Sequence, residues 1–147
     1  GLNWNCRTDD WVLEGWINIH QFTSAGANFF GTPKLYVLRE SGNLIVGDFQ
    51  VNPIVQSLNW PAFDSWFHLA IAASGGNLRA YLNGTRVADV TNNMRNETST
   101  YLWLGSLTSG TTYRLNGWMD EIRLTVGSDR GYTGSTIDVP TAAFPNP

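Results

Sequence analysis

The stretch SWFHLAIAASGGNLRAYLNGTRVADV, residues 65–90, has the pattern of three consecutive antiparallel strands. Apolar side chains recur at every second position of residues 67–73, so they share one face of an extended segment. The sequence GGN at residues 75–77 and the pair Asn83 and Gly84 tolerate the positive φ that tight turns require. Short turns between alternating runs predict a three-stranded meander.

The composition extends this β pattern to the whole chain. Of 147 residues, 13% are aromatic and 15 are glycine, and runs rich in Ala, Glu and Lys are missing. This composition is typical of an all-β protein. A chain of this length suits one domain and buries about two thirds of its unfolded surface, so it needs neither a metal nor a disulfide to fold.

Charge, cysteine content and the length of apolar runs argue against nucleic-acid binding, an internal disulfide and membrane insertion. The net charge is −3, and the nine basic residues are scattered without forming a run, which argues against nucleic acid as a partner. Cys6 is the single cysteine, so no internal disulfide forms, and we expect it to be a small hydrophobic residue close to the core. No apolar run has the length of a membrane span, so no membrane insertion is expected.

Alternation and turn residues divide the rest of the chain into strands and connections. Strands are predicted over residues 11–20, 35–39, 44–51, 101–106 and 114–126. Loops are predicted over residues 21–33 and 91–99, and a connection over residues 52–64, where Pro53 and Pro61 exclude a central strand. Residues 127–147 lose periodicity and contain several prolines, which predicts an extended tail laid over the domain, with Phe144 as its anchor.

Two parts of this division leave questions open. Only residues 1–10 are available for a strand before residue 11, so either a short strand forms at residues 2–6 or a neighbouring segment or chain completes the sheet edge. In the last strand, uninterrupted alternation places Ile122, Leu124 and Val126 on the expected core face, together with Trp118. Asp120 then shares that face as an anomaly.

Three motifs in order carry a family resemblance. WFHLA at 66–70 followed by LRAYLNG at 78–84, then LWLG at 102–105 and LNGWMDEIRL at 115–124, resemble the motifs of laminin-G-like, concanavalin A-like jelly rolls. The resemblance implies an all-β, two-sheet antiparallel β-sandwich, with residues 1–147 as one laminin-G-like jelly-roll domain and 127–147 as its tail. It also implies that Trp66, Trp103 and Trp118 are buried within strand motifs.

The closing segment is similar to the tail that ends such domains in bacteriophage virion proteins. It runs from Tyr132 and Thr133 to the prolines near the end of the chain. This similarity implies a location on a virion surface, as part of a tail fibre, spike or capsid decoration protein.

Catalytic residues are not evident. Endoglucanases of similar architecture carry an E-x-D-x-x-E strand motif, since retaining hydrolysis needs two carboxyl groups about 5 Å apart. That motif is missing, Glu14 is alone on its strand, and Asp120 and Glu121 are expected to point to opposite faces of a sheet. His20 and His68 have no nucleophile or second ligand at a recognisable spacing. We therefore expect no enzymatic activity.

A metal site is weighed and not favoured. Laminin-G-like modules often bind calcium at the sandwich rim, and four aspartates lie near predicted strand ends: Asp48, Asp64, Asp89 and Asp129. None belongs to a dense loop of acidic and amide ligands. The expectation is no cofactor, with Ca²⁺ as the minor alternative.

Seven tryptophans exceed what a core of this size needs, which admits sugar binding. Sugar recognition pairs an aromatic face with nearby hydrogen-bonding groups. Trp60 on a predicted connection is the best candidate for such a platform, with Asp64, Asn93 and Arg95 as polar partners. The alternative is that these are ordinary solvated loop residues.

The sequence thus predicts a non-catalytic module on a bacteriophage virion surface that adheres to host glycans. One alternative is a purely structural decoration protein that binds other virion proteins and no sugar. A glycoside hydrolase is a further alternative. Virion proteins of this kind commonly form trimers, so a homo-oligomer or a larger assembly is expected.

Overall fold

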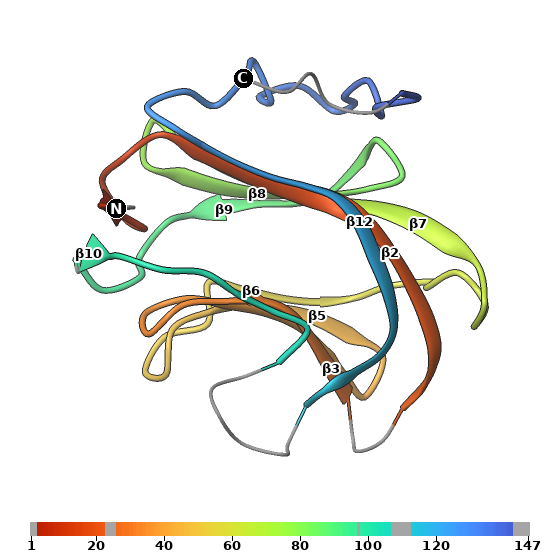
Figure 1. Cartoon of the computed structure of the whole chain (residues 1–147). Coiled ribbons are helices and arrows are strands. Elements are labelled where there is room, and N and C mark those ends of the chain that lie inside the picture. Colours follow the sequence, from red (N-terminus) through yellow and green to blue (C-terminus); the bar gives the residue numbers. More distant parts are fainter. Residues whose placement is uncertain (1–2, 23–25, 97, 107–112, 143–147) are drawn as a thin grey trace.

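The computed structural model describes residues 3–22, 26–96, 98–106 and 113–142, and these residues form strands and turns with no helix. Two five-stranded antiparallel sheets pack face to face (Figure 1). The first sheet has the order β12 (Leu115–Val126), β2 (Trp11–Phe22), β7 (Trp66–Ser74), β8 (Asn77–Leu82) and β9 (Thr85–Thr91). The second has the order β11 (Trp103–Leu104), β3 (Gly26–Gly31), β4 (Tyr36–Glu40), β5 (Asn43–Gly47) and β6 (Ile54–Ser57). The predicted all-β sandwich is confirmed.

The predicted meander forms β7, β8 and β9 of the first sheet. Its turns have positive φ at Gly75 (56°) and Gly76 (78°), and at Asn83 (48°) and Gly84 (83°). These turn residues keep each strand in register with the next, so Phe67, Leu69, Ile71 and Ala73 of β7 face the second sheet.

The core fills the space between the two sheets. Its largest fully buried side chains come from both sheets and from the N-terminal segment: Trp4, Trp11, Phe29, Phe30, Phe67, Leu13, Ile17, Ile19, Leu35, Leu44 and Ile54. No helix among the described residues is long and apolar enough to cross a membrane.

All three predicted connections contain a strand: β3 lies within residues 21–33, β6 within residues 52–64 and β10 (Thr98–Ser99) within residues 91–99. β3 is fully buried although it carries the polar Asn28, because Asn28 bonds to a distant segment: its N–H donates to the Tyr113 carbonyl at 2.8 Å and its Nδ2 to the Ser106 carbonyl at 2.7 Å. β6 follows Pro53 directly and lies at the edge of its sheet, where proline is tolerated. The predictions of loops over residues 21–33 and 91–99 were wrong in this respect, whereas β6 is an edge strand, in agreement with the prediction that Pro53 and Pro61 exclude a central strand.

The N-terminal segment finds its strand partner within the chain. β1 (Trp4–Asn5) pairs with β10 (Thr98–Ser99) in a separate two-stranded sheet. Cys6, next to β1, is buried, as expected, and as the single cysteine it forms no disulfide within the chain.

A β-bulge in β12 overturns the expected alternation of that strand. The register shifts between Asp120 and Arg123, and Glu121 has a φ of 49°. Met119 faces inward before the bulge and Ile122 after it, where the Ile122 side chain packs over Gly15: a Cβ there would lie 2.3 Å from Ile122 Cδ1. Trp118 and Asp120 therefore face outward. The expected anomaly, Asp120 on the core face, is not present.

Residues 127–142 cross the outer face of the first sheet, above β8 in Figure 1. Tyr132 and Ile137 pack on Tyr81 and on small side chains of β2 and β7. The tail thus covers one half of this outer face. The predicted anchor Phe144 lies outside the described residues.

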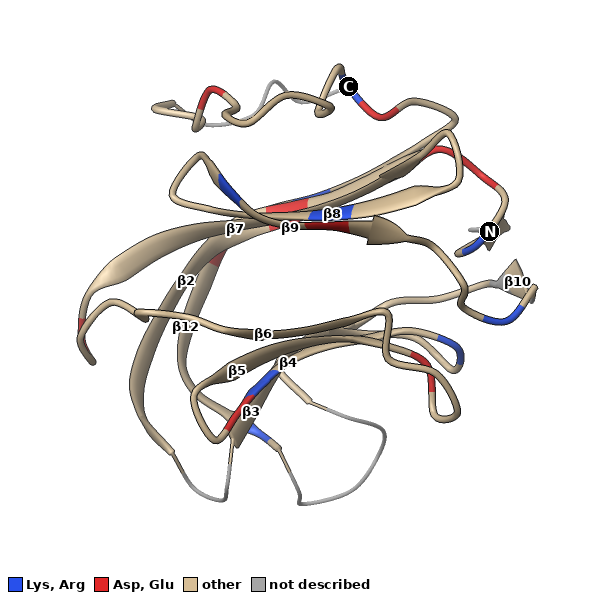
Figure 2. Ribbon diagram, turned by 180° about the vertical axis from the view of Figure 1, so that it is seen from behind, with Lys and Arg blue, Asp and Glu red and all other residues tan. Residues whose placement is uncertain are grey.

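Charges are paired across the outer strands of the first sheet. Figure 2 shows acidic and basic residues side by side on β8 and β9, where Asp89 lies 3.3 Å from Arg79 and 3.0 Å from Arg86. This pairing leaves no continuous basic stripe along these two strands.

Candidate functional site

The half of the first sheet not crossed by the tail exposes a row of tryptophans. Asn18 of β2 is directly opposite Trp118 of β12 on one side and Trp66 of β7 on the other. Trp118 is 56% exposed and Trp66 is 46% exposed, whereas Asn18 between them is 7% exposed. Because adjacent strands lie about 4.8 Å apart, the two tryptophans start about 10 Å apart on the sheet surface.

Asn18 brings an unused hydrogen-bond acceptor to this row. Its Oδ1 is buried and has no hydrogen-bond partner among the residues that the structure describes. A buried acceptor without a partner costs about 1–3 kcal/mol of stability. A ligand hydroxyl placed between the two indoles would supply the missing donor.

The next row along the strands continues the aromatic surface. Trp16 lies opposite Asp120 on one side and His68 on the other. The Trp16 and His68 rings meet edge-on, with their centroids 5.6 Å apart. Trp16 is half-buried and Asp120 is exposed. We call Trp118, Asn18, Trp66, Trp16 and Asp120 the tryptophan face.

A polar pair borders the tryptophan face. His20 Nδ1 lies 2.7 Å from Asp64 Oδ1, and the His20 ring lies 6.2 Å from that of Trp118. Asp64 has a φ of 61°, and its N–H donates to the Ile19 carbonyl, which holds this residue beside β2. Hydrogen-bonding groups thus stand at the rim of the aromatic row.

A groove extends from the tryptophan face toward the tail. Trp16, Asp120 and Glu121 line a space of about 310 Å³ together with residues 140–142. Asp120 and Glu121, expected on opposite faces of a regular strand, both line this groove at the bulge. The same tail residues also line a larger space of about 650 Å³ beneath residues 130–142.

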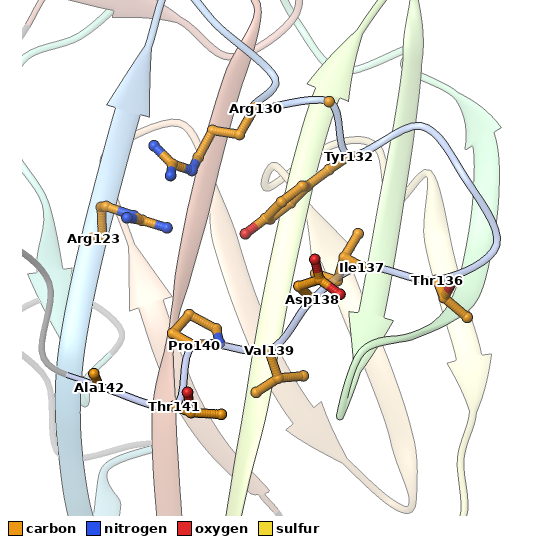
Figure 3. Close-up of a pocket in the computed structure, with 11 residues that line it drawn as sticks. Arg123, Arg130, Tyr132, Thr136, Ile137, Asp138, Val139, Pro140, Thr141 and Ala142 are labelled. Carbon is orange, nitrogen blue, oxygen red and sulfur yellow. The ribbon is translucent and has the colours of Figure 1, made fainter.

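The larger space lies between the tail and β12, with arginine side chains at one end (Figure 3). Arg123 projects from β12 and Arg130 from the tail toward the Tyr132 hydroxyl. These side chains enclose the buried carboxylate of Glu14, with which each of them interacts.

Glu14 is the buried charge beside the larger space. Its Oε1 accepts hydrogen bonds from Arg123 Nη2 at 2.6 Å and Nε at 3.0 Å, and its Oε2 accepts one from the Tyr132 hydroxyl at 3.1 Å. Burial alone would raise the pKa of Glu14, but the opposing effects of His68 and Arg123 outweigh it, so the pKa lies below its ordinary value. Glu14 thereby links β2 to Arg123 of β12 and to Tyr132 of the tail.

The four residues predicted as a binding site are not brought together by their contacts. Trp60 is half-buried: its Nε1 donates to the Gly42 carbonyl at 3.0 Å, and its ring contacts those of Phe29 and Phe67. Asp64 pairs with His20 at the border of the tryptophan face.

The two predicted residues on the rim loop differ in their surroundings. Arg95 is bound to Asp48, with Nε 3.3 Å from Oδ1 and the backbone N–H donating to Oδ2 at 2.8 Å. Asn93 is exposed.

The prediction from sequence missed both exposed members of the tryptophan row. Trp66 and Trp118 were expected to be buried and are exposed, and Trp103 is half-buried. The sequence held one usable signal, because Trp118 shares its strand face with Asp120 and an acidic neighbour favours the solvent side.

The aspartates considered for calcium are engaged separately. Asp48 binds Arg95, Asp64 binds His20, and Asp89 binds Arg79 and Arg86. Asp129 accepts the Gly131 N–H at 2.9 Å. Across the described ranges, no three His, Cys, Asp or Glu side chains are grouped as metal ligands.

Solved structures with a similar fold include proteins that act on or bind carbohydrates. Domain 4 of an extracellular arabinanase from Geobacillus stearothermophilus, solved with arabinotriose, has a TM-score of 0.62 at 21% identity, covering 82% of this chain and 62% of that one. An alginate lyase from Corynebacterium sp. has a TM-score of 0.55 at 10% identity, covering 84% and 61%. Sheep galectin-11, solved with glycerol, has a TM-score of 0.52 at 6% identity, covering 84% and 96%.

These likenesses establish the fold and not a ligand. The chain spans about three fifths of the length of the arabinanase domain and of the alginate lyase. A search of curated proteins found no match to this sequence. The family model of the concanavalin A-like lectin/glucanases superfamily matches residues 3–126, and the chain therefore belongs to that superfamily.

Proposed function

We propose that this domain is a non-catalytic carbohydrate-binding module and that the tryptophan face is its sugar site. The observation that carries the proposal is the row in which two exposed indoles flank a buried carboxamide with an unpaired acceptor. Indole faces bind the C–H surfaces of sugar rings, and a fixed acceptor between them selects the position of a hydroxyl. Exposed tryptophans on a sheet have no comparable role in stabilising the core.

The row suits a chain of sugars better than a single ring. The tryptophans start about 10 Å apart across three strands, so a glycan lying across the strands can stack at both ends. The groove beside Trp16 extends the surface for further units. Of the similar structures, the arabinanase domain was solved with a trisaccharide, so arabino-oligosaccharides belong among the first probes.

The test is a glycan array, followed by calorimetry on the sugars that bind. Trp118→Ala and Trp66→Ala should each weaken binding more than tenfold, as expected for an aromatic residue at the centre of an interface. Tyr101→Ala is the matched control, because Tyr101 is 50% exposed and lies outside the tryptophan face. The proposal fails if the array gives no bound glycan, or if both tryptophan variants bind as the wild type does.

A hydrolase is the second candidate, since Asp120 and Glu121 line one groove beside Trp16. Cleavage of a glycosidic bond by acid–base catalysis needs a pair of carboxyl groups on either side of that bond, and these two residues are the acidic ones nearest to such a place. We expect no release of reducing ends from any glycan that binds. Turnover that is lost in Asp120→Asn would replace the binding function by a catalytic one.

The location on a bacteriophage virion surface is part of the proposal and rests on the similarity of the closing segment to phage proteins. A host cell-surface polysaccharide would then be the natural ligand. An oligomer, a trimer among them, also stays a prediction. The two segments on which it rested are used within the chain, because β1 pairs with β10 and the tail lies on its own sheet.

A further inference from the structure

A third pocket lies on the outer face of the second sheet, across the sandwich from the tryptophan face. It has a volume of about 190 Å³ and is lined by Tyr36, Leu38, Glu40, Ile45, Phe49, Asn52 and Tyr113. Tyr36, Leu38 and Glu40 are alternate residues of β4, and Val37 between them is in the core, so the three face outward together.

The loop after β5 is folded so that two of its residues complete the pocket. A Cβ on Gly47 would lie 2.4 Å from the Val51 carbonyl oxygen, so the loop can fold back only over a glycine. Buried Asp48 fixes the loop, because its Oδ1 accepts the N–H groups of Gln50 at 2.8 Å and Val51 at 3.0 Å. Phe49 is thereby held beside Tyr36 while 53% of it remains exposed.

Three aromatic side chains form walls of this pocket. The rings of Tyr36 and Phe49 have centroids 5.3 Å apart and planes at 69°, which makes a corner. Tyr113 lines the pocket as well, and its hydroxyl donates to the Glu40 carboxylate. The Tyr36 hydroxyl donates to the Asn52 side-chain oxygen.

The polarity of the pocket favours a cation. Both phenol hydrogens are already donated, so the pocket presents aromatic rings and acceptor oxygens. Among the lining residues that the structure describes, Glu40 is the one charged residue, and none is Lys or Arg. Burial and the nearby carboxylates of Asp48 and Glu40 raise the pKa of Tyr36, so this phenol stays neutral.

We propose that this pocket binds a small organic cation of the quaternary or methylated ammonium class, such as the trimethylammonium group of choline. Aromatic rings attract cations through their quadrupoles, and several rings with one carboxylate recognise quaternary ammonium groups. A pocket smaller than the roughly 300 Å³ of ordinary ligand sites suits a compact head group. The proposal does not depend on the sugar site, which lies on the other sheet.

NMR titrations of the ¹⁵N-labelled protein test the proposed cation site. Choline and tetramethylammonium should shift the backbone N–H signals of Tyr36, Phe49 and Asn52. The neutral 3,3-dimethylbutanol has the shape of choline without its charge and should bind at least fivefold more weakly. N-trimethyl-lysine, compared with choline, shows whether the head group is read from a side chain or as a free small molecule.

Two variants remove the parts that the proposal invokes. Phe49→Ala should weaken choline binding about five- to thirtyfold, the range expected for a lost cation–π contact. Glu40→Gln should weaken choline and leave dimethylbutanol unchanged. Both positions are at the surface of the pocket, and unchanged melting temperatures confirm that the variants fold.

Three outcomes would overturn the proposal. These are equal affinity for choline and its neutral analogue, saturation of the same signals by a neutral sugar but not by choline, and no response to any probe. Trp118→Ala should leave choline binding unchanged. Loss of sugar binding in that variant therefore reports on the proposed function alone.

Discussion

Glu14 has no exposed surface, and it lies where the tail, β2 and β12 meet. Arg123 and Tyr132 bind its two oxygens, and His68 Nε2 lies 3.3 Å from Oε2. A buried carboxylate without such partners would be strongly destabilising. The ionised form of Glu14 is therefore stabilised by these partners. Loss of Glu14 would in turn leave their polar groups without a partner and lower the stability of the fold.

Glu14→Gln should lower the free energy of unfolding by about 3 kcal/mol at neutral pH, because it leaves the Arg123 guanidinium without its buried counter-charge. Urea denaturation measures this difference. Asp138→Asn is the matched control, since it removes one negative charge at an exposed position of the tail. A loss below 1 kcal/mol, or an equal loss in the control, would show that the network does not stabilise the fold.

The same pair of proteins gives a pH dependence. The pKa of Glu14 in the folded state lies below the ordinary value of 4.5, so the carboxylate contributes stability above that value. The contribution is lost as the pH falls through the lower folded pKa. The difference in unfolding free energy between wild type and Glu14→Gln should therefore shrink below about pH 4.5. A difference that grows with acidification would reverse the assigned direction.

At the scale of elements, the tail is attached to the meander by few and specific bonds. The Tyr81 hydroxyl lies 2.9 Å from the Tyr132 carbonyl and 3.0 Å from that of Gly134. Backbone bonds run from Arg86 N–H to the Ser135 carbonyl and from Ile137 N–H to the Gly84 carbonyl. Gly84 is required there, because a Cβ would lie 2.8 Å from the Ile137 oxygen.

Tyr81→Phe should loosen the tail while keeping the sheet. The substitution removes one hydroxyl and leaves two carbonyls without it, a cost of about 1–2 kcal/mol. Hydrogen exchange at the Arg86 and Ile137 amides should become faster, whereas amides within β7 should not change. Tyr101→Phe at an exposed position is the control. Unchanged exchange at both tail-linked amides would show that packing of Tyr132 and Ile137 alone holds the tail.

The sequence predicted the elements whose alternation is uninterrupted. The meander and β2 were found because their apolar residues keep a period of two and their turns contain glycine or asparagine. β3 was missed because its burial depends on bonds from Asn28 to residues far along the chain. Local pattern cannot show such a partner.

The candidate site was missed for a related reason. The bulge at Glu121 places a non-glycine residue at positive φ and shifts every later side chain of β12 by one position. Counting alternate positions across that bulge assigned Trp118 to the core. If Asp120 is instead assumed to face solvent, the same alternation predicts that Trp118 is exposed. That prediction would have located one end of the tryptophan row.

At the scale of the whole molecule, the sandwich presents two outer faces of different chemistry. The first carries tryptophans with an amide acceptor, and the second carries phenols with a carboxylate. Two sheets packed about 10 Å apart and one apolar core separate them. A single rigid domain could thus engage a sugar chain and an organic cation on opposite sides.

We expect these two faces to act independently. Sites on opposite faces of a domain that share no contacting residues usually contribute additively to binding free energies. A coupling free energy would require two arrangements of the core between them. Choline affinity should therefore change less than twofold when the tryptophan face is saturated with its glycan, and glycan affinity should show the same insensitivity to choline. Phe49→Ala should weaken only choline binding, Trp118→Ala should weaken only glycan binding, and the double variant should show both losses. A larger mutual effect of the two ligands, equal in each direction as linkage demands, would show instead that the core transmits binding between the sheets.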